Sequence, residues 1–294
     1  MRRTNVQIVY INKDGDRITF GQQPPFLISS KKGFAAVQNT ITSQKQYGLD
    51  GEYFIHQQLE SRDLEIDGEI TGMNDANLMN NRLNLIKVFN PNLAGVLQFS
   101  DNGRTFEIDV LVEEAPTMDS SRNNLTEKFS LKLKALDPYW MDKSEQNRFI
   151  SLSSVVSNFK FPLSIGSNFT FGEISSGNIS EIKNNGDVVV GMDIELRITA
   201  NCKNPKVLNV MTQEFFGFNG TYTSGTTFNI CTIRGKKEVT KIVNGVITNA
   251  MAERMVGSSF LQLEKGSNFL KIQADSGAEN VIGSVTFSPL VVGV

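Results

Sequence analysis

The chain has 294 residues, 39% of them hydrophobic and 20% charged, which is enough for one large or two ordinary globular domains. Its 29 basic and 31 acidic side chains nearly balance, which argues against a dedicated nucleic-acid-binding protein and against a polybasic membrane-binding segment. No run of about 18 apolar residues exists, and no apolar stretch of signal-peptide length follows the N-terminal arginines, so we expect synthesis in the cytoplasm and no membrane anchor.

Hairpins dominate the first half of the sequence. The segments QIVYIN and RITF flank a turn at Asp14-Gly15, and GVLQFS and RTFEIDVLVEE flank a second turn at Asn102-Gly103. The segment KFSLKLKAL then alternates strictly between apolar and polar residues, with Lys128, Ser130, Lys132 and Lys134 on its polar side. We therefore expect a β-rich first domain.

One short amphipathic helix interrupts these strands. Asn74 or Asp75 can cap its start, and Pro91 stops it. Its apolar residues recur near helical spacing, and they are Leu78, Met79, Leu83, Ile86 and Phe89. The pattern leaves open whether the helix packs on its own domain or on a neighbouring copy.

The composition changes after the segment Asp137-Pro138-Tyr139-Trp140. Residues 141–186 are rich in Ser, Asn, Phe and Gly, and residues from 187 onward read as short strands separated by turns. Several short strands at regular spacing are typical of a β-sandwich. The predicted division is residues 1–140 and residues 141–294, with 141–186 as a lead-in segment.

Few residues could support catalysis or bind a metal ion. His56 is the single histidine, and we interpret it as a polar strand residue rather than a catalytic base. Cys202 and Cys231 are the two cysteines, and we expect buried, reduced thiols. With no phosphate-binding glycine loop either, the sequence predicts a protein that is not an enzyme, with no cofactor and no metal site.

An acidic segment stands out at Asp63, Glu65, Asp67 and Glu69. In a strand these four carboxylates share one face, while Leu64, Ile66 and Ile70 share the other. Four like charges on one strand face repel each other, and we expect these carboxylates to gain nothing from the fold. The face is either a solvated surface or one that repels a polyanion.

The aromatic residues are mostly phenylalanine, 20 Phe against 5 Tyr and 1 Trp. Saccharide-binding surfaces usually expose Trp or Tyr, because these rings combine a stacking face with a polar group. The sequence therefore supplies no obvious aromatic platform. The candidate ligand loop lies near residues 217–225, with Phe216, Phe218 and Tyr222.

The order of these segments resembles the siphovirus tail-component family, the distal tail proteins of long-tailed phages and phage-tail-like bacteriocins. The resemblance rests on the opening hairpin with Gln23-Pro24-Pro25-Phe26-Leu27, the turn Gly48-Leu49-Asp50-Gly51, and the ending Asp137-Pro138-Tyr139-Trp140. In the second half it rests on Phe161-Pro162-Leu163, Asn184-Asn185-Gly186-Asp187, Asn204-Pro205 and the late turn Leu263-Glu264-Lys265-Gly266-Ser267-Asn268. Many relatives have Pro before the Gly of that late turn, where this chain has Glu-Lys.

The resemblance implies a mainly β protein: an N-terminal split β-barrel with one short helix, and a C-terminal galectin-like or carbohydrate-module-like β-sandwich. It implies a structural hub of the virion tail tip, with six copies forming a ring that joins the tail tube protein to the tail-tip protein. DNA would pass through the ring without specific binding. A host-surface saccharide bound by the C-terminal sandwich is the alternative function.

The ring gives the acidic segment a second interpretation. Six copies of Asp63, Glu65, Asp67 and Glu69 would place about two dozen carboxylates around one channel, and their field would keep DNA phosphates from the wall. We therefore expect these four residues to line the channel. We also expect Asp137, Pro138, Tyr139 and Trp140 to form the junction that fixes the angle between the domains.

Overall fold

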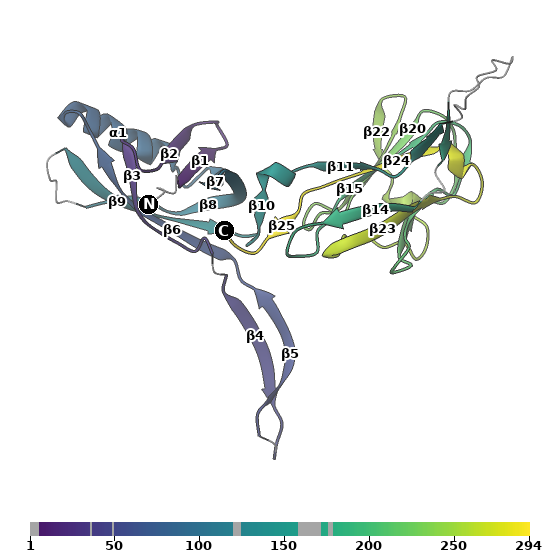
Figure 1. Cartoon of the computed structure of the whole chain (residues 1–294), viewed down its shortest axis with the longest axis horizontal. Coiled ribbons are helices and arrows are strands. Elements are labelled where there is room, and N and C mark those ends of the chain that lie inside the picture. The colour runs from purple at the N-terminus through teal and green to yellow at the C-terminus, as the bar shows by residue number, and fades with distance from the viewer. Residues whose placement is uncertain (1–5, 36, 49, 120–124, 158–171, 176–178) are drawn as a thin grey trace. The chain divides into compact units, whose positions relative to one another are not determined.

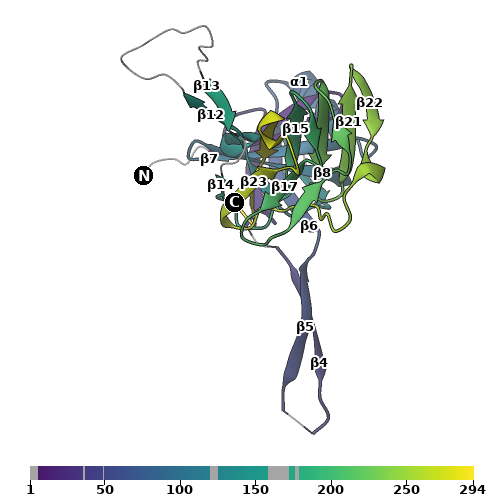
Figure 2. The same ribbon diagram turned by 90° about the vertical axis from the view of Figure 1, so that its right-hand side faces the viewer.

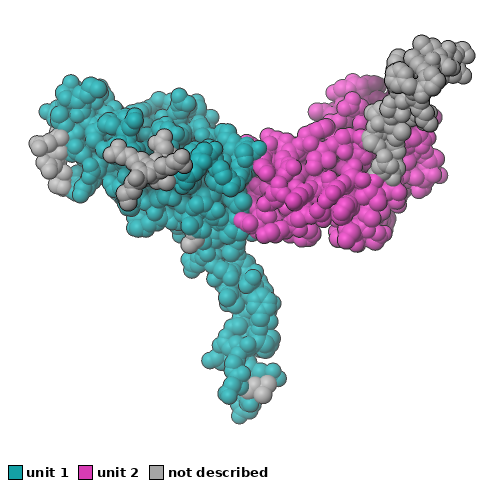
Figure 3. Space-filling model, in the orientation of Figure 1, with its two compact units in different colours: residues 1–144, 291–294 teal, residues 145–290 magenta. Residues whose placement is uncertain are grey.

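The computed structural model describes residues 6–35, 37–48, 50–119, 125–157, 172–175 and 179–294. Its contacts divide the chain into two compact units (Figure 3). Unit 1 comprises Met1–Ser144 and Val291–Val294, and unit 2 comprises Glu145–Leu290. The division falls four residues after the boundary expected at residue 140, and the last four residues of the chain belong to unit 1. No helix among the described residues is long and apolar enough to cross a membrane.

Unit 1 is built on one nine-stranded sheet (Figure 1). Its main path runs in the order β2-β1-β7-β8-β9-β6-β3, and β10 pairs with β8 and with β25. The strands are β1 (Gln7–Asn12), β2 (Arg17–Phe20), β3 (Phe26–Lys32), β6 (Arg62–Thr71), β7 (Ala94–Asp101), β8 (Arg104–Met118), β9 (Thr126–Ala135), β10 (Trp140–Asp142) and β25 (Leu290–Val291).

Both predicted hairpins are confirmed. β1 pairs antiparallel with β2 across a turn in which Gly15 has a φ of +85°. β7 pairs with β8, and both Asn102 (φ +49°) and Gly103 (φ +81°) adopt left-handed backbone conformations at the turn. Two successive residues with positive φ are the geometry of a type I′ turn, whose twist matches that of the flanking strands, and Asn-Gly is its preferred sequence.

The sheet of unit 1 curls until its two ends meet. Gly21, directly after β2, forms a bridge to Leu27 of β3. The amide of Gly21 donates to the carbonyl of Phe26 at 3.1 Å, and the amide of Ile28 donates to the carbonyl of Gly21 at 2.9 Å. Because β2 and β3 are the two ends of the main path, this contact produces the barrel-like closure that the resemblance implied.

The predicted helix is α1 (Asp75–Val88), and it packs against β6, β2 and β8. Asn74 is its N-cap, and its side-chain oxygen accepts a hydrogen bond from the amide of Asn77 at 2.8 Å. Leu78, Leu85 and Val88 are buried in the core that the curled sheet encloses. The helix therefore packs on its own unit through one face.

Unit 2 contains two larger sheets. The six-stranded sheet has the order β11-β24-β15-β20-β21-β22, and the four-stranded sheet has the order β14-β23-β17-β18. The first comprises β11 (Arg148–Ser151), β15 (Asp193–Ile198), β20 (Thr226–Cys231), β21 (Glu238–Val243), β22 (Val246–Asn249) and β24 (Val281–Phe287). The second comprises β14 (Ile179–Asn184), β17 (Lys206–Asn209), β18 (Phe215–Gly217) and β23 (Gly266–Gln273).

Two short strand pairs complete the described part of unit 2, and the described residues of the chain also include three single-turn 3₁₀ helices. The pairs are β12 (Ser154–Ser157) with β13 (Gly172–Ser175), and β16 (Cys202–Lys203) with β19 (Thr221–Tyr222), and the 3₁₀ helices are η1 (Lys143–Glu145), η2 (Met251–Glu253) and η3 (Ala278–Asn280). Inward residues of both larger sheets, such as Leu196, Phe228 and Leu270, form one buried core, which is the arrangement of a β-sandwich. The motif Phe161-Pro162-Leu163 lies outside the described residues.

Candidate assembly surfaces

The four acidic residues lie on β6 with the predicted alternation. Asp63 is exposed and Glu65, Asp67 and Glu69 are half-buried, whereas Leu64, Ile66 and Ile70 on the other side of the strand are buried in the core. The four carboxylates therefore share the face of the sheet that is turned away from the core. Whether that face lines a channel stays a prediction.

Lysines of the neighbouring strand stand opposite these carboxylates. The register between β6 and β9 places Asp63 opposite Lys134, Glu65 opposite Lys132, Asp67 opposite Ser130, and Glu69 opposite Lys128. The Nζ of Lys134 lies 3.2 Å from the Asp63 carboxylate and 3.3 Å from that of Glu113. Asp63 thus forms a cross-strand pair with a basic residue, and the expectation that the carboxylates gain nothing from the fold is corrected for this residue.

The remaining neighbours extend this acid–lysine face, by which we mean the outward side chains of β3, β6, β9 and β8. On β3 the Nζ of Lys32 lies 2.9 Å from the Glu65 carboxylate, and on β8 the Glu114 carboxylate lies 2.7 Å from the Nζ of Lys132. Exposed pairs of this kind each contribute at most about 1 kcal/mol. Their larger effect is electrostatic, because they reduce the negative potential of the face.

Asp67 is held by hydroxyl groups instead of a lysine. Hydrogen bonds from Ser130 and Ser30 lower the pKa of Asp67, and the Ser30 hydroxyl donates to its carboxylate at 2.7 Å. Both hydroxyls come from strands adjacent to β6, so this arrangement exists only in the folded sheet. Asp67 is therefore the one carboxylate of the four whose ionised form is favoured by neutral donors.

Asp67→Asn is expected to make the free energy of unfolding of unit 1 fall less at acidic pH than it does in the wild type. The difference should be less than about 1 kcal/mol. A carboxyl with a pKa depressed in the folded state adds stability above its unfolded pKa of about 3.9 and loses it as the pH falls through the folded value. Urea unfolding between about pH 2.5 and 6 measures the effect, with the exposed turn residue Asp14→Asn as control. An identical pH dependence in Asp67→Asn and the wild type would contradict the assignment.

A long two-stranded arm projects from unit 1 (Figures 1 and 2). It consists of β4 (Asn39–Lys45) and β5 (Glu52–Leu59), which pair only with each other among the described strands. Large apolar side chains on it are exposed, including Ile41 (60%) and Phe54 (61%). The register places Phe54 opposite Ser43, two residues after Ile41, so both apolar side chains lie on the same face of the ribbon.

A second uncovered apolar surface lies on α1. Met79, Leu83 and Ile86 are each between 41% and 51% exposed, and their spacing of four and three residues places them on one face of the helix. We call this the helix stripe. Of the five residues whose helical spacing was noted in the sequence, only Leu78 and Phe89 are buried in the unit's own core.

Of the four predicted junction residues, Pro138 and Trp140 are buried in unit 1, whereas Tyr139 is half-buried and Asp137 is exposed. Trp140 is fully buried, and its ring stacks on Phe34 with the centroids 5.5 Å apart. The carbonyl of Pro138 accepts a hydrogen bond at 2.9 Å from the Nε of Arg62, a buried arginine that the sequence reasoning did not single out. Burial lowers the pKa of Arg62. The role of the junction in fixing an interdomain angle stays a prediction.

Arg62 joins three segments that are far apart in the sequence. Besides Pro138, its guanidinium donates to the carbonyls of Gly33 and Phe34 in the segment after β3 and of Val292 near the C-terminus. In the sequence, Arg62 was recognisable only because it lies on the same side of β6 as the apolar residues of the alternating pattern. That pattern identifies a buried side chain but not its partners.

The structure corrects the candidate ligand loop. Phe216 and Phe218 are fully buried, and their rings pack in the core of unit 2, where Phe218 stacks on Phe228 at 3.8 Å. Neither ring can offer a face to a ligand. The hydroxyl of Tyr222 lies 2.9 Å from the Glu253 carboxylate, and burial together with this hydrogen bond raises the pKa of Tyr222.

The remaining sequence candidates are separate from one another. His56 is exposed on the arm, opposite Thr42. Both cysteines are free thiols: Cys202 is buried, which raises its pKa to about 11, whereas Cys231 is half-buried and not fully buried as expected. Among the residues that the structure describes, no group of three or more His, Cys, Asp and Glu side chains is arranged to hold a metal ion.

Comparison with known proteins gives consistent matches. The family model described as phage tail protein RIFT-related domain matches residues 13–135, and the model described as siphovirus-type tail component, C-terminal domain, matches residues 185–289. Neither description names a catalytic activity. A search of curated proteins found no match.

Among solved structures, the fold is similar to that of SPP1 Dit, described as a paradigm of the hub adsorption apparatus in phages that infect Gram-positive bacteria. The TM-score is 0.68 at 14% identity, over 96% of this chain and 98% of that chain. Two structures of the phage p2 baseplate in its activated conformation, with Sr and with Ca, each match at a TM-score of 0.48 and 12% identity, over 96% of this chain and 98% and 97% of those chains. The chain therefore belongs to the siphovirus tail-component family of distal tail proteins and is a structural component of the phage virion tail.

Proposed function

We propose that unit 1 assembles head-to-tail into a closed ring of six copies that forms the hub of the tail tip. The single observation that carries the proposal is the arm, a β-ribbon whose apolar side chains are uncovered within unit 1. The ring would join the tail tube protein to the tail-tip protein and surround the path of the DNA, which passes through without specific binding. The family membership and the likeness to SPP1 Dit support a hub role.

The arm is physically unsuited to stand alone in water. A two-stranded ribbon is at best marginally stable in isolation, and that of β4 and β5 exposes Ile41 and Phe54 on one face. Packing this face against a second copy would bury apolar area at about 25 cal/mol per Å² and order the ribbon. We therefore assign the arm to the interface between neighbouring copies.

A closed ring needs two different surfaces on each copy, because a head-to-tail contact is heterologous. Unit 1 offers two uncovered apolar surfaces, the arm and the helix stripe. In both views the arm leaves unit 1 on the side away from α1 (Figures 1 and 2). This placement suits an interface that repeats around a ring, with the arm and the stripe facing different neighbours.

The acid–lysine face is the surface we assign to the channel. Per copy it carries the carboxylates of Asp63, Glu65, Asp67 and Glu69, those of Glu113 and Glu114, and the ammonium groups of Lys32, Lys128, Lys132 and Lys134. Six acids against four bases leave a net charge of −2, so six copies would present about a dozen net negative charges rather than two dozen. A weaker repulsion of phosphates remains.

Light scattering over a range of protein concentrations tests the ring. We expect the mass to rise toward that of six chains in the wild type, and to stay near that of one chain in the double variant Ile41→Ser/Phe54→Ser. Val246→Ser/Ile247→Ser is the matched control, because these exposed residues lie in unit 2 (63% and 67%). A wild type that stays monomeric at every concentration, or an arm variant that still associates, would contradict the proposal.

The alternative function, binding of a host-surface saccharide by unit 2, has one observation in its favour. The outward face of the six-stranded sheet contains a hollow of about 650 Å³ that is lined by polar side chains together with Phe149 and three isoleucines. This site differs from the loop expected from the sequence, and it shares no residue with that loop.

A further inference from the structure

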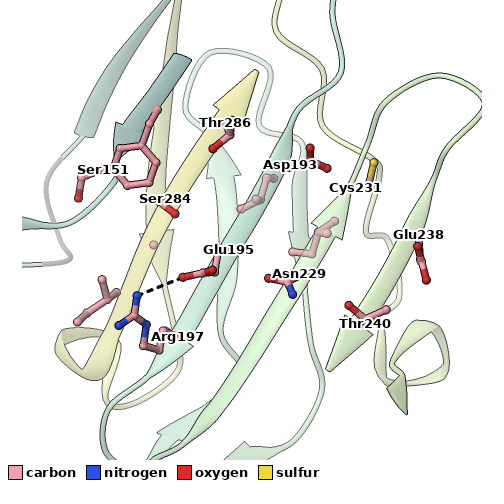
Figure 4. A pocket seen from close by; sticks show the side chains of 15 residues that line it. Ser151, Asp193, Glu195, Arg197, Asn229, Cys231, Glu238, Thr240, Ser284 and Thr286 are labelled. Carbon is pink, nitrogen blue, oxygen red and sulfur yellow. Dashed lines mark hydrogen bonds and ion pairs between the residues drawn. The ribbon is translucent and has the colours of Figure 1, made fainter. Parts of the chain in front are cut away.

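The hollow lies on the outward face of the six-stranded sheet of unit 2 (Figure 4). Strands β11, β24, β15, β20 and β21 contribute its lining, and the opposite face of the same strands forms the core of the sandwich. Its volume of about 650 Å³ is within the range of small-molecule binding sites. The site lies wholly within unit 2, so it does not depend on whether unit 1 forms a ring.

The strand register arranges the lining in rows across the sheet. The central row is polar at every position, and from β11 to β21 it reads Ser151, Ser284, Glu195, Asn229 and Thr240. Most of these side chains are short, so they form the floor of the hollow. The next row reads Phe149, Thr286, Asp193, Cys231 and Glu238, and it places a large ring on the edge strand.

The floor retains unused hydrogen-bonding capacity. Among the described residues, the side chains of Ser284, Asn229 and Thr240 form no hydrogen bond with another part of the chain. An amide and two hydroxyls provide both donors and acceptors. Beside them Glu195 forms an ion pair with Arg197 at 3.3 Å, visible as the dashed line in Figure 4. The hollow thus presents donors, acceptors and one charged pair within a small area.

The charge of the hollow restricts the ligand. Asp193, Glu195 and Glu238 line it together with a single guanidinium, that of Arg197. This excess of carboxylates disfavours phosphate, sulfate and nucleic acid. Phe149 adds an apolar element, since its side chain is 68% exposed at one edge. A ligand with many neutral hydroxyl groups and an apolar C–H face matches this combination.

We propose that the hollow binds a neutral saccharide, an inference that rests on the alternative function proposed above for unit 2. The hydroxyls of the sugar would hydrogen-bond with Asn229, Thr240, Ser284 and the Glu195 carboxylate, and the ring of Phe149 would contact its C–H face. An outward antiparallel sheet face is normally polar. Here the distinguishing features are the concave floor of short, unpaired polar side chains and the exposed ring beside it.

An array of neutral and anionic oligosaccharides, probed with the full-length protein, tests the site. Titration calorimetry with the tightest neutral oligosaccharide then compares the wild type with Asn229→Ala, Glu195→Gln and Phe149→Ala. We expect the first two changes to weaken binding at least about tenfold each, because a buried sugar hydroxyl loses its partner. Asn201→Ala is the matched control: it removes an exposed amide outside the hollow and should leave binding unchanged.

Each other outcome counts against the proposal. Absence of binding to every neutral oligosaccharide, or a preference for anionic ones, would overturn it. Binding that Asn229→Ala and Glu195→Gln leave unchanged would place the saccharide elsewhere. Thermal unfolding of each variant separates loss of the site from loss of the fold. A wild type that stays monomeric would contradict the ring proposal but not the saccharide proposal. An array without binding would contradict the saccharide proposal but not the ring proposal.

Discussion

Arg62→Met is expected to lower the free energy of unfolding of unit 1 by about 3–5 kcal/mol. Arg62 is 2% exposed, and its guanidinium donates to the carbonyls of Gly33, Phe34, Pro138 and Val292. Removing it leaves buried acceptors without donors, and each unsatisfied group costs about 1–3 kcal/mol, less where water can enter. It also releases one attachment of the C-terminal segment to unit 1.

The chain offers a selective measurement for this variant. Trp140 is the single tryptophan and lies in the core of unit 1, so its fluorescence during urea unfolding reports on that unit. We expect the urea midpoint to fall by about 1–2 M. Arg17→Met is the control, because Arg17 is exposed on β2 and its loss should change stability by less than about 0.5 kcal/mol. Equal midpoints for the two variants would show that the Arg62 contacts contribute little.

Trp140→Ala is expected to be similarly damaging, at about 3–5 kcal/mol. The indole is fully buried, stacks on Phe34 at 5.5 Å and packs against Phe99 at 6.5 Å, so its removal leaves a large cavity between the sheet and the segment after β3. Phe34 itself contacts the last residue of the chain, because its carbonyl accepts from the amide of Val294 at 3.2 Å. The cavity should therefore loosen the C-terminal segment as well.

Calorimetry measures this second effect, since the variant has lost its fluorescent probe. Trp140→Phe is the matched control, because it keeps an aromatic ring in the stack, and we expect it to recover most of the lost stability. Limited proteolysis across residues 137–160 gives an independent readout, with faster cleavage expected in Trp140→Ala. Equal stability of Trp140→Ala and Trp140→Phe would mean that ring packing at this position is not important for unit 1.

Local patterns in the sequence predicted the individual elements well. The alternation in β6 and β9 identified which side of each strand is buried, because successive side chains of a strand point to opposite faces. Asn102-Gly103 identified a turn, because its left-handed backbone conformations favour these two residues. Asn74 and Pro91 marked the ends of the helix for reasons that are equally local.

The tertiary structure decided which strands are neighbours. The sequence contained the carboxylates of residues 63–69 and the lysines of residues 128–134 as two separate alternating patterns. Only the register between β6 and β9 brings them together, and it converts a bare acidic strand into a mostly paired face. Strand pairing over about 65 residues depends on the packing of the whole sheet, which no local pattern encodes.

Burial was the other property that the sequence left open. Phe216 and Phe218 were expected near a ligand, and Phe149 was not noted, yet the first two lie in the core and the third is exposed. Likewise, nothing in the sequence marked Ile41 and Phe54, whereas the structure places both side chains exposed on the two-stranded arm. Apolar residues favour burial, but which of them are buried depends on the elements that pack around them. The sequence by itself therefore determined the strands, turns and helix of this protein, and the tertiary structure decided which of their faces remain free to bind.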